Sequence, residues 1–188
     1  MSGIMVPKAR AEAPVGGGEF TFPEGSFIAE IEQVRTKPFP EWLAGRAGYA
    51  SGDGEITSIQ LGAITPTEGD GNVGNRKFFI DFTTRDGEVS VEAGPDIPEA
   101  SWQMQKSAAL LTNLAQALGA TDEVEMDGET YVVTTDGFLE QLKSGELSGS
   151  RVGFTTFHRK WTSKTAKNAD GTPKSGTEVC VQEFFQAV

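Results

Sequence analysis

The segment GDGNVGNRKFFIDF, from Gly69 to Phe82, begins with the spacing G-x-G-x-x-G. In dinucleotide-binding proteins such glycines connect a strand to a helix, whose N-terminus then binds the pyrophosphate. Here the residues that follow alternate as a strand, with Phe78 and Ile80 on one face, so no helix N-terminus is available. No Lys-Ser or Lys-Thr pair follows Gly74, as a P-loop requires, and the Gly and distal Glu of a calcium loop are missing. We therefore interpret the glycines as a hairpin turn.

Cationic and aromatic residues interleave on the strand after this turn. The basic pair Arg76 and Lys77 precedes it, and an alternation that buries Phe78 turns Lys77 and Phe79 outward. The strand predicted from SRVGFTTFHRKW repeats the pattern. Its outward residues are Arg151, Phe157, Arg159 and Trp161, with Lys160 beside them.

This combination is what single-stranded nucleic acid requires, because bases stack on flat rings while phosphates pair with nearby Lys or Arg. The alternative interpretation is that Phe79, Phe157 and Trp161 pack under a helix or a loop as ordinary core residues, since large aromatic side chains are usually buried. The side of the sheet on which Phe79 and Trp161 lie decides between the two.

Motifs for catalysis are missing from the chain. His158 is the only histidine, which excludes a histidine metal cluster and an H-E-x-x-H motif, and no G-x-S-x-G sequence is present. Cys180 lies in an apolar run and is expected to be a small core residue. The carboxylates between Asp122 and Glu129 are interpreted as a solvated loop. We expect a protein that is not an enzyme, with no catalytic residue, no metal site and no cofactor.

Charge is distributed unevenly along the chain. The 188 residues carry a net charge of −11 at pH 7, which taken alone argues against a nucleic-acid partner. From Arg151 to Thr177, however, six Lys and Arg accompany one Asp, so this segment carries +5 and the other 161 residues carry −16. Such asymmetry favours an anionic partner on one surface, and a solvated basic loop is the alternative.

The expected order of elements is three strands, a helical insertion and two strands. Strands are predicted in SFIAEIEQV, ITSIQLGAI and RKFFIDFTT, and GEVSVEAG extends or pairs with the third. KSAALLTNLAQALG has the apolar spacing of an amphipathic helix closed by Gly119, and a short helix is predicted from Thr135 to Gly145. SRVGFTTFHRKW and TEVCVQEFFQAV supply the last two strands. This order predicts a mainly β, OB-fold-like five-stranded Greek-key barrel, with both helices in the insertion between strands 3 and 4.

Two long connections of this predicted barrel carry positive charge, at the places where an OB-fold has its binding loops. One runs from Arg35 to Gly54 and the other from Ser163 to Gly176. The candidate nucleic-acid-binding residues of the two loops are Arg35, Lys37, Trp42, Arg46, Tyr49, Lys164, Lys167 and Lys174.

Residues 1–19, which end in a glycine run, are predicted to form a flexible N-terminal arm, and residues 20–188 a single OB-like domain. Residues 120–149 form an acidic insertion with a short helix. No stretch has the continuous apolar run of a signal peptide or a membrane span. We expect a soluble, cytoplasmic protein without a membrane partner.

The chain resembles a family of small phage-encoded proteins that are found near recombination and replication genes and are thought to bind single-stranded DNA. The resemblance lies in GSFIAEIEQV, GNRKFFIDF, the AALLTNLAQALG helix, GSRVGFTTF and VCVQEFF, and it covers most of residues 24–188. It implies an OB-type fold, single-stranded DNA as the partner, further contacts with phage recombination or replication proteins, and the host cell cytoplasm as the location. The insertion at residues 120–149 is larger than a minimal barrel needs.

We therefore expect a single-stranded DNA-binding protein with little sequence preference, in which Lys and Arg neutralise phosphates while Phe79, Trp161 and Trp42 stack bases. The alternative is a phage virion structural or decoration protein, whose N-terminal arm reaches a neighbouring subunit. A carbohydrate-binding module is a third interpretation, because exposed aromatic rings also suit sugars. The oligomeric state stays open at this stage.

Overall fold

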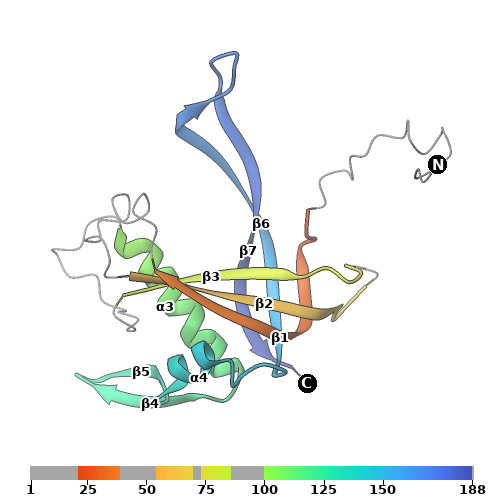
Figure 1. The fold of residues 1–188 in the computed structure, drawn as a ribbon. Coiled ribbons are helices and arrows are strands. Elements are labelled where there is room, and N and C mark those ends of the chain that lie inside the picture. Colours follow the sequence, from red (N-terminus) through yellow and green to blue (C-terminus); the bar gives the residue numbers. More distant parts are fainter. Residues whose placement is uncertain (1–20, 39–53, 70–72, 86–99, 188) are drawn as a thin grey trace, which may run out of the picture.

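The structure is a computed structural model that describes residues 21–38, 54–69, 73–85 and 100–187. Within these ranges the chain forms seven strands and two helices (Figure 1). They are β1 (Gly25–Pro38), β2 (Gly54–Pro66), β3 (Phe78–Arg85), α3 (Ala100–Ala117), β4 (Thr121–Met126), β5 (Glu129–Thr134), α4 (Phe138–Ser144), β6 (Arg151–Lys167) and β7 (Pro173–Gln186). The predicted N-terminal arm and the segment GEVSVEAG lie outside the described residues.

Five strands form one antiparallel sheet in the order β3-β2-β1-β6-β7. Strand β1 joins its two halves, because it pairs with β2 along most of its length and with β6 over residues 25–30. Three strands, an insertion and two strands in this order confirm the mainly β, OB-fold-like architecture. The sheet is not a closed barrel, however, because β3 and β7 are its two edges and do not pair with each other.

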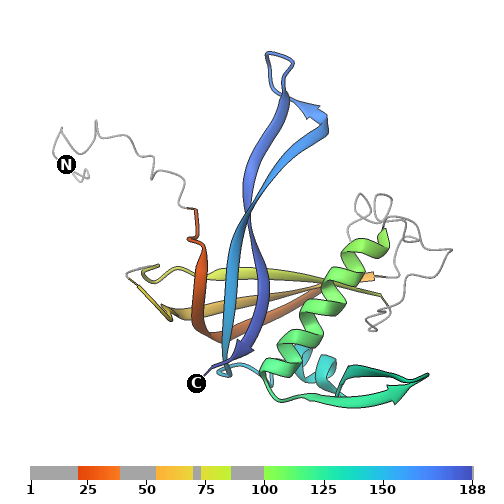
Figure 2. The same ribbon diagram turned by 180° about the vertical axis from the view of Figure 1, so that it is seen from behind.

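Helix α3 packs on both edge strands, β7 and β3, and so covers the opening of the sheet (Figure 2). The predicted amphipathic face is confirmed, since Leu111, Leu114 and Ala115 are buried. Two polar side chains of the same helix accept hydrogen bonds from backbone N–H groups of the two edge strands. The Thr83 N–H of β3 donates to Ser107 Oγ at 2.8 Å, and the Phe184 N–H of β7 donates to Asn113 Oδ1. The helix thus replaces the strand pairing that a closed barrel would have.

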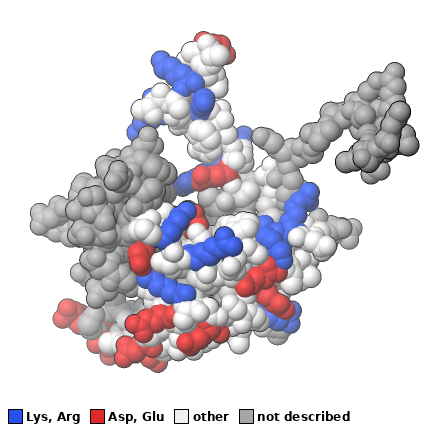
Figure 3. Space-filling model, viewed as in Figure 1, with Lys and Arg blue, Asp and Glu red and all other residues white. Residues whose placement is uncertain are grey.

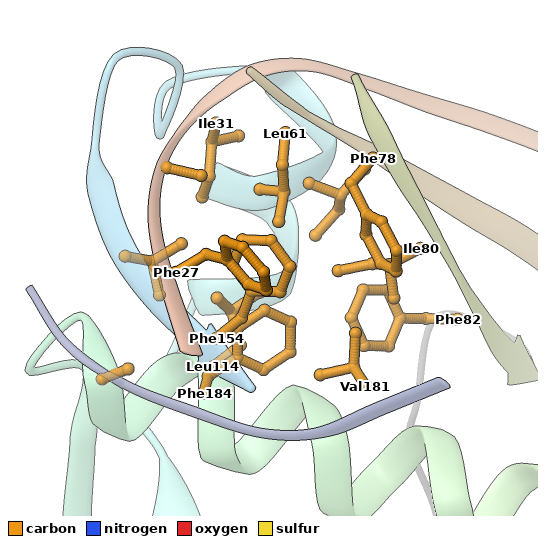
Figure 4. Close-up of a cluster of buried hydrophobic side chains, with 14 of the residues drawn as sticks. Phe27, Ile31, Leu61, Phe78, Ile80, Phe82, Leu114, Phe154, Val181 and Phe184 are labelled. Carbon is orange, nitrogen blue, oxygen red and sulfur yellow. The ribbon is translucent and has the colours of Figure 1, made fainter. Parts of the chain in front are cut away.

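The core lies between the two halves of the sheet and the helix (Figure 4). Its centre is aromatic. The ring centroids of Phe27 and Phe154 are 5.5 Å apart, and those of Phe78 and Phe154 are 5.3 Å apart. Phe22, just before β1, lies edge-on to Phe78 with centroids 4.8 Å apart. Rings from β1, β3 and β6 therefore meet in one cluster, which ties the first half of the sheet to the second.

The acidic segment predicted to be a solvated loop is instead a two-stranded hairpin, β4 and β5. Asp127 and Gly128 connect the strands, and both have positive φ, 54° and 81°. An Asp-Gly pair in this conformation is a favoured two-residue hairpin turn, because its twist matches that of the strands. In DEVEM and ETYVV, apolar and polar residues alternate over a short stretch, which is typical of a strand. An interpretation based on charge alone overlooks this pattern.

Strands continue into both predicted binding loops. Strand β1 runs to Pro38, so Arg35 and Lys37 are strand residues. Strands β6 and β7 pair as far as Lys167 and Pro173, so the predicted loop from Ser163 to Gly176 is mostly hairpin. The predicted short helix is confirmed as α4, which is capped by Gly145 but begins at Phe138 and not near Thr135. The glycine segment lies between antiparallel strands β2 and β3, and its residues 70–72 are outside the described residues.

We predict that Ser107→Ala lowers the free energy of unfolding by about 0.5–1.5 kcal/mol, because the partly buried Thr83 N–H loses the hydroxyl oxygen that accepts its hydrogen bond. Urea denaturation followed by circular dichroism measures the change. Gln116→Ala on the exposed side of the same helix is the control and should change the free energy of unfolding little. Equal stability of Ser107→Ala and the wild type would contradict the role assigned to this hydrogen bond.

Candidate functional site

The outer face of the sheet is shaped by an irregularity in strand β1. Phe27, Ala29 and Ile31 point into the core, and strict alternation would turn Arg35 inward as well. The pairing with β2 shifts between Ile31 and Gln33, which leaves Glu32 as an extra, unpaired residue. After such a bulge, positions of the strand whose side chains would have pointed into the core point to the outer face of the sheet instead. The side chains after the bulge that line the outer face are Gln33, Arg35 and Lys37.

These three residues and their neighbours form a shallow hollow of about 270 Å³ on β1, β2 and β3. We call it the β1–β3 face and define it by Gln33, Arg35, Lys37, Ser58, Gln60 and Phe79. The strand register explains the grouping: Gln33 is opposite Gln60, which is opposite Phe79. In a neighbouring register pair, Arg35 of β1 is opposite Ser58 of β2, and the Ser58 hydroxyl donates a hydrogen bond to Asp81 of β3. Two cations, two amides and one aromatic ring therefore share a single surface.

Phe79 is the most exposed large hydrophobic residue among those that the structure describes, at 64%. Its neighbours Phe78 and Ile80 are buried at 8% and 6%, as the alternation predicts. Packing under a helix or a loop is therefore not the role of this ring. An exposed benzyl side chain beside Arg35 and Lys37 supplies both a stacking surface and positive charge.

A small ion-pair network lies at the edge of this face. Glu32, the bulged residue, accepts hydrogen bonds from Lys77 Nζ and, at 2.7 Å, from Gln60 Nε2. The Lys77 hydrogen bond, followed by that of Gln60, lowers the pKa of Glu32 below its ordinary value of 4.5. A Cβ atom at Gly62 would overlap the Glu32 carboxylate, so the glycine makes room for it. Lys77 is therefore held by Glu32, and the cations that line the hollow are Arg35 and Lys37.

A cleft of about 460 Å³ lies between the edge strands β3 and β7, over helix α3. Its walls include Phe79 on one side and Arg159 on the other, so it connects the β1–β3 face with strand β6. The Arg159 guanidinium pairs with Glu178, its cross-strand neighbour. The deeper walls are apolar and include Ile80 and Leu110.

Beyond the cleft, β6 and β7 project from the sheet as a long two-stranded hairpin (Figure 1). We call residues 157–167 and 173–179 the β6–β7 arm. Phe157 and Trp161 are exposed on it at 37% and 41%. A Cβ atom at Gly176 would lie 2.9 Å from Trp161 Cζ2, so the indole ring is positioned over this glycine. The basic residues of the arm are Arg159, Lys160, Lys164, Lys167 and Lys174.

The structure separates some residues that the sequence grouped together. Arg151 begins β6 at the end remote from the arm and pairs in register with Glu30. Arg76 is exposed in the connection before β3 and lines neither hollow. The predicted residues Trp42, Arg46 and Tyr49 lie outside the described residues.

Three polar residues of the β1–β3 face were missed from the sequence: Gln33, Ser58 and Gln60. In ITSIQL, Ser58 and Gln60 alternate with buried Ile59 and Leu61, so the period of two was enough to place them outward. Gln33 carried no such signal, because its orientation depends on the bulge at Glu32.

Other site types find no support in the described part of the chain. It contains no cluster of three or more His, Cys, Asp or Glu placed to hold a metal ion. None of its helices is both long and apolar enough to span a membrane. Comparison of the sequence with protein-family models and curated proteins, and of the fold with solved structures, finds no match.

We predict that Lys77→Ala raises the pKa of Glu32 toward 4.5, because the hydrogen bond that contributes most to the lowering is lost. NMR titration of the side-chain carboxyl carbons measures the change. In the wild type, the stabilisation by this pair is complete above the ordinary pKa and is lost as the pH falls through the lowered one. Lys143→Ala, which removes the partner of Glu55 instead, is the control and should leave the titration of Glu32 unchanged. A Glu32 pKa that does not respond to Lys77→Ala would contradict the network.

Proposed function

We propose that this protein binds single-stranded DNA with little sequence preference. One observation carries the proposal: Phe79, 64% exposed, shares a hollow with Arg35 and Lys37 on the outer face of the first three strands. In OB-folds, the face of strands 2 and 3 is a surface that binds oligonucleotides. An open ring beside two cations matches the stacked base and the adjacent phosphates of a single strand.

The position of the cleft and the arm supports a continuous path for the strand. Phe79 borders both the β1–β3 face and the cleft, and Arg159 borders the cleft from the other side. From there the arm continues with Phe157 and Trp161. A single strand that follows this path meets aromatic rings and cations alternately, and neither kind of contact reads base identity. The duplex form is disfavoured, because its bases are already stacked on one another.

The role in phage replication or recombination belongs to the same proposal and rests on the resemblance stated above. Contacts with recombination or replication proteins would follow from it. The charge pattern is compatible with binding an anion despite the net charge of −11, because the basic residues of the arm are segregated from most acids (Figure 3).

We predict that Phe79→Ala weakens binding of a fluorescent oligo-dT by about 1–3 kcal/mol, or roughly 5-fold to 150-fold, since one stacking contact is lost. Fluorescence anisotropy at low salt measures the affinity. Tyr131→Ala is the matched control, because Tyr131 is also an exposed aromatic residue, at 36%, but lies on the acidic β4–β5 hairpin. A wild type that fails to bind even at low salt would refute the function. Wild-type affinity in Phe79→Ala would remove the ring from the site.

We further predict that replacing Lys164, Lys167 and Lys174 together by Ala makes binding less sensitive to salt. Each phosphate contact on a single strand contributes about 0.7 to the slope of log K against log salt concentration, so three lost contacts reduce the slope by about 2. Titrations at several salt concentrations measure it. The same slope in the wild type and the triple variant would exclude the arm from the binding path.

A further inference from the structure

The exposed hydrophobic residues of this protein are concentrated on two hairpins. Among the residues that the structure describes, seven large hydrophobic side chains are exposed. One is Phe79, two lie on the β6–β7 arm, and four lie on the β4–β5 hairpin: Val124, Tyr131, Val132 and Val133. A two-stranded hairpin has little core of its own, and clustered exposed apolar residues on it mark a surface that contacts another molecule.

The β4–β5 hairpin presents these residues in an acidic setting. Residues directly opposite each other on antiparallel strands share a face, so Val124, Tyr131 and Val133 lie together on one side of it. Asp122 and Glu129 lie on the same side, in the register pairs at either end of this apolar group. Residues 121–134 contain five Asp and Glu and no Lys or Arg. A partner for this surface must therefore be basic and must also offer apolar contacts.

The β6–β7 arm has these properties. Its register puts Phe157, Arg159 and Trp161 on one side, and its exposed lysines continue toward its tip. Five Lys and Arg on the arm outnumber its one acid, Glu178. Both hairpins also have outer strand edges that pair with no other described strand. The two surfaces are thus complementary in charge, in apolar content and in form.

Within one chain the two hairpins lie at opposite ends of the molecule, as both ribbon views show (Figures 1 and 2). In Figure 3, acidic side chains gather at the end formed by β4 and β5, and basic side chains lie on the arm. Because the complementary surfaces point away from each other, a contact between them requires two copies of the chain. Each copy keeps one surface of each kind free, so such a contact repeats.

We propose that the protein self-associates head to tail, with the acidic β4–β5 hairpin of one copy docked on the basic β6–β7 arm of the next. The contact is heterologous, so it repeats from copy to copy and either closes into a ring or continues as an open chain. It requires no nucleic acid and does not rest on the proposed DNA binding. Both proposals use the arm, but only self-association needs the carboxylates of the hairpin.

Two charge-reversal variants test this contact in the full-length chain without nucleic acid. The first is Asp122→Lys with Glu129→Lys, which changes the charge of residues 121–134 from −5 to −1, and the second is Lys164→Glu with Lys167→Glu, which changes that of the arm from +4 to 0. All four positions are exposed. Sedimentation velocity at low and high salt measures the size of the species, and circular dichroism checks that each variant is folded.

We expect the wild type to form species larger than the 20.1 kDa chain at low salt and to dissociate at high salt. Each variant alone should lose these species, since most of the charge attraction between its hairpin and its arm is then removed. In an equimolar mixture the two variants should associate again, because the unchanged acidic hairpin of the second fits the unchanged basic arm of the first. Recovery in the mixture also excludes misfolding as the cause of the loss.

The matched control is Glu140→Lys with Glu146→Lys, the same charge change at two exposed positions in and just after α4, outside both hairpins. It should associate like the wild type. A wild type that stays monomeric at low salt would overturn the proposal and leave a basic segment of another protein as the occupant of the acidic hairpin. Folded variants that do not associate when mixed, or loss of association in the control, would overturn it as well.

Discussion

The shared use of strand β1 is the constraint on which the rest of the structure depends. It must pair with β2 along most of its length and with β6 at its beginning, although these partners belong to halves of the sheet that run in different directions. Two irregularities in its register accommodate this demand. The aromatic core forms where the halves diverge, and strands β6 and β7 continue beyond the sheet as the arm because β1 no longer accompanies them.

The open sheet sets the second constraint. Two edge strands that face each other without pairing leave donors that must be satisfied. Helix α3 does this with Ser107 and Asn113 while it buries Leu111 and Leu114. The same arrangement leaves a cleft over the helix, and this cleft separates Phe79 from the base of the arm. Helix α3, which stabilises the opening of the sheet, therefore also keeps the two parts of the candidate binding surface apart, namely the β1–β3 face and the β6–β7 arm.

Long hairpins with exposed strand edges carry a risk of indiscriminate pairing, which charged side chains reduce. Here the charges have opposite sign on the two hairpins: the β4–β5 hairpin is acidic and the β6–β7 arm is basic. Like hairpins of two copies repel each other, whereas unlike hairpins attract. In the proposed DNA binding, the same segregation would let an acidic protein present a basic surface to a polyanion. One feature of the charge pattern thus underlies both proposals.

Local patterns in the sequence were sufficient to predict the order of the five strands of the main sheet, the buried face of α3 and the exposure of Phe79, because each depends only on a period of two or 3.6 residues. The Asp127-Gly128 turn was also present in the sequence and was overlooked. The orientation of Arg35 and Lys37 was decided by the tertiary structure, since the bulge before them arises from pairing with β2. The tertiary structure also decided that the sheet stays open between β3 and β7. Pairing of these two strands depends on long-range packing, which no local pattern in the sequence encodes.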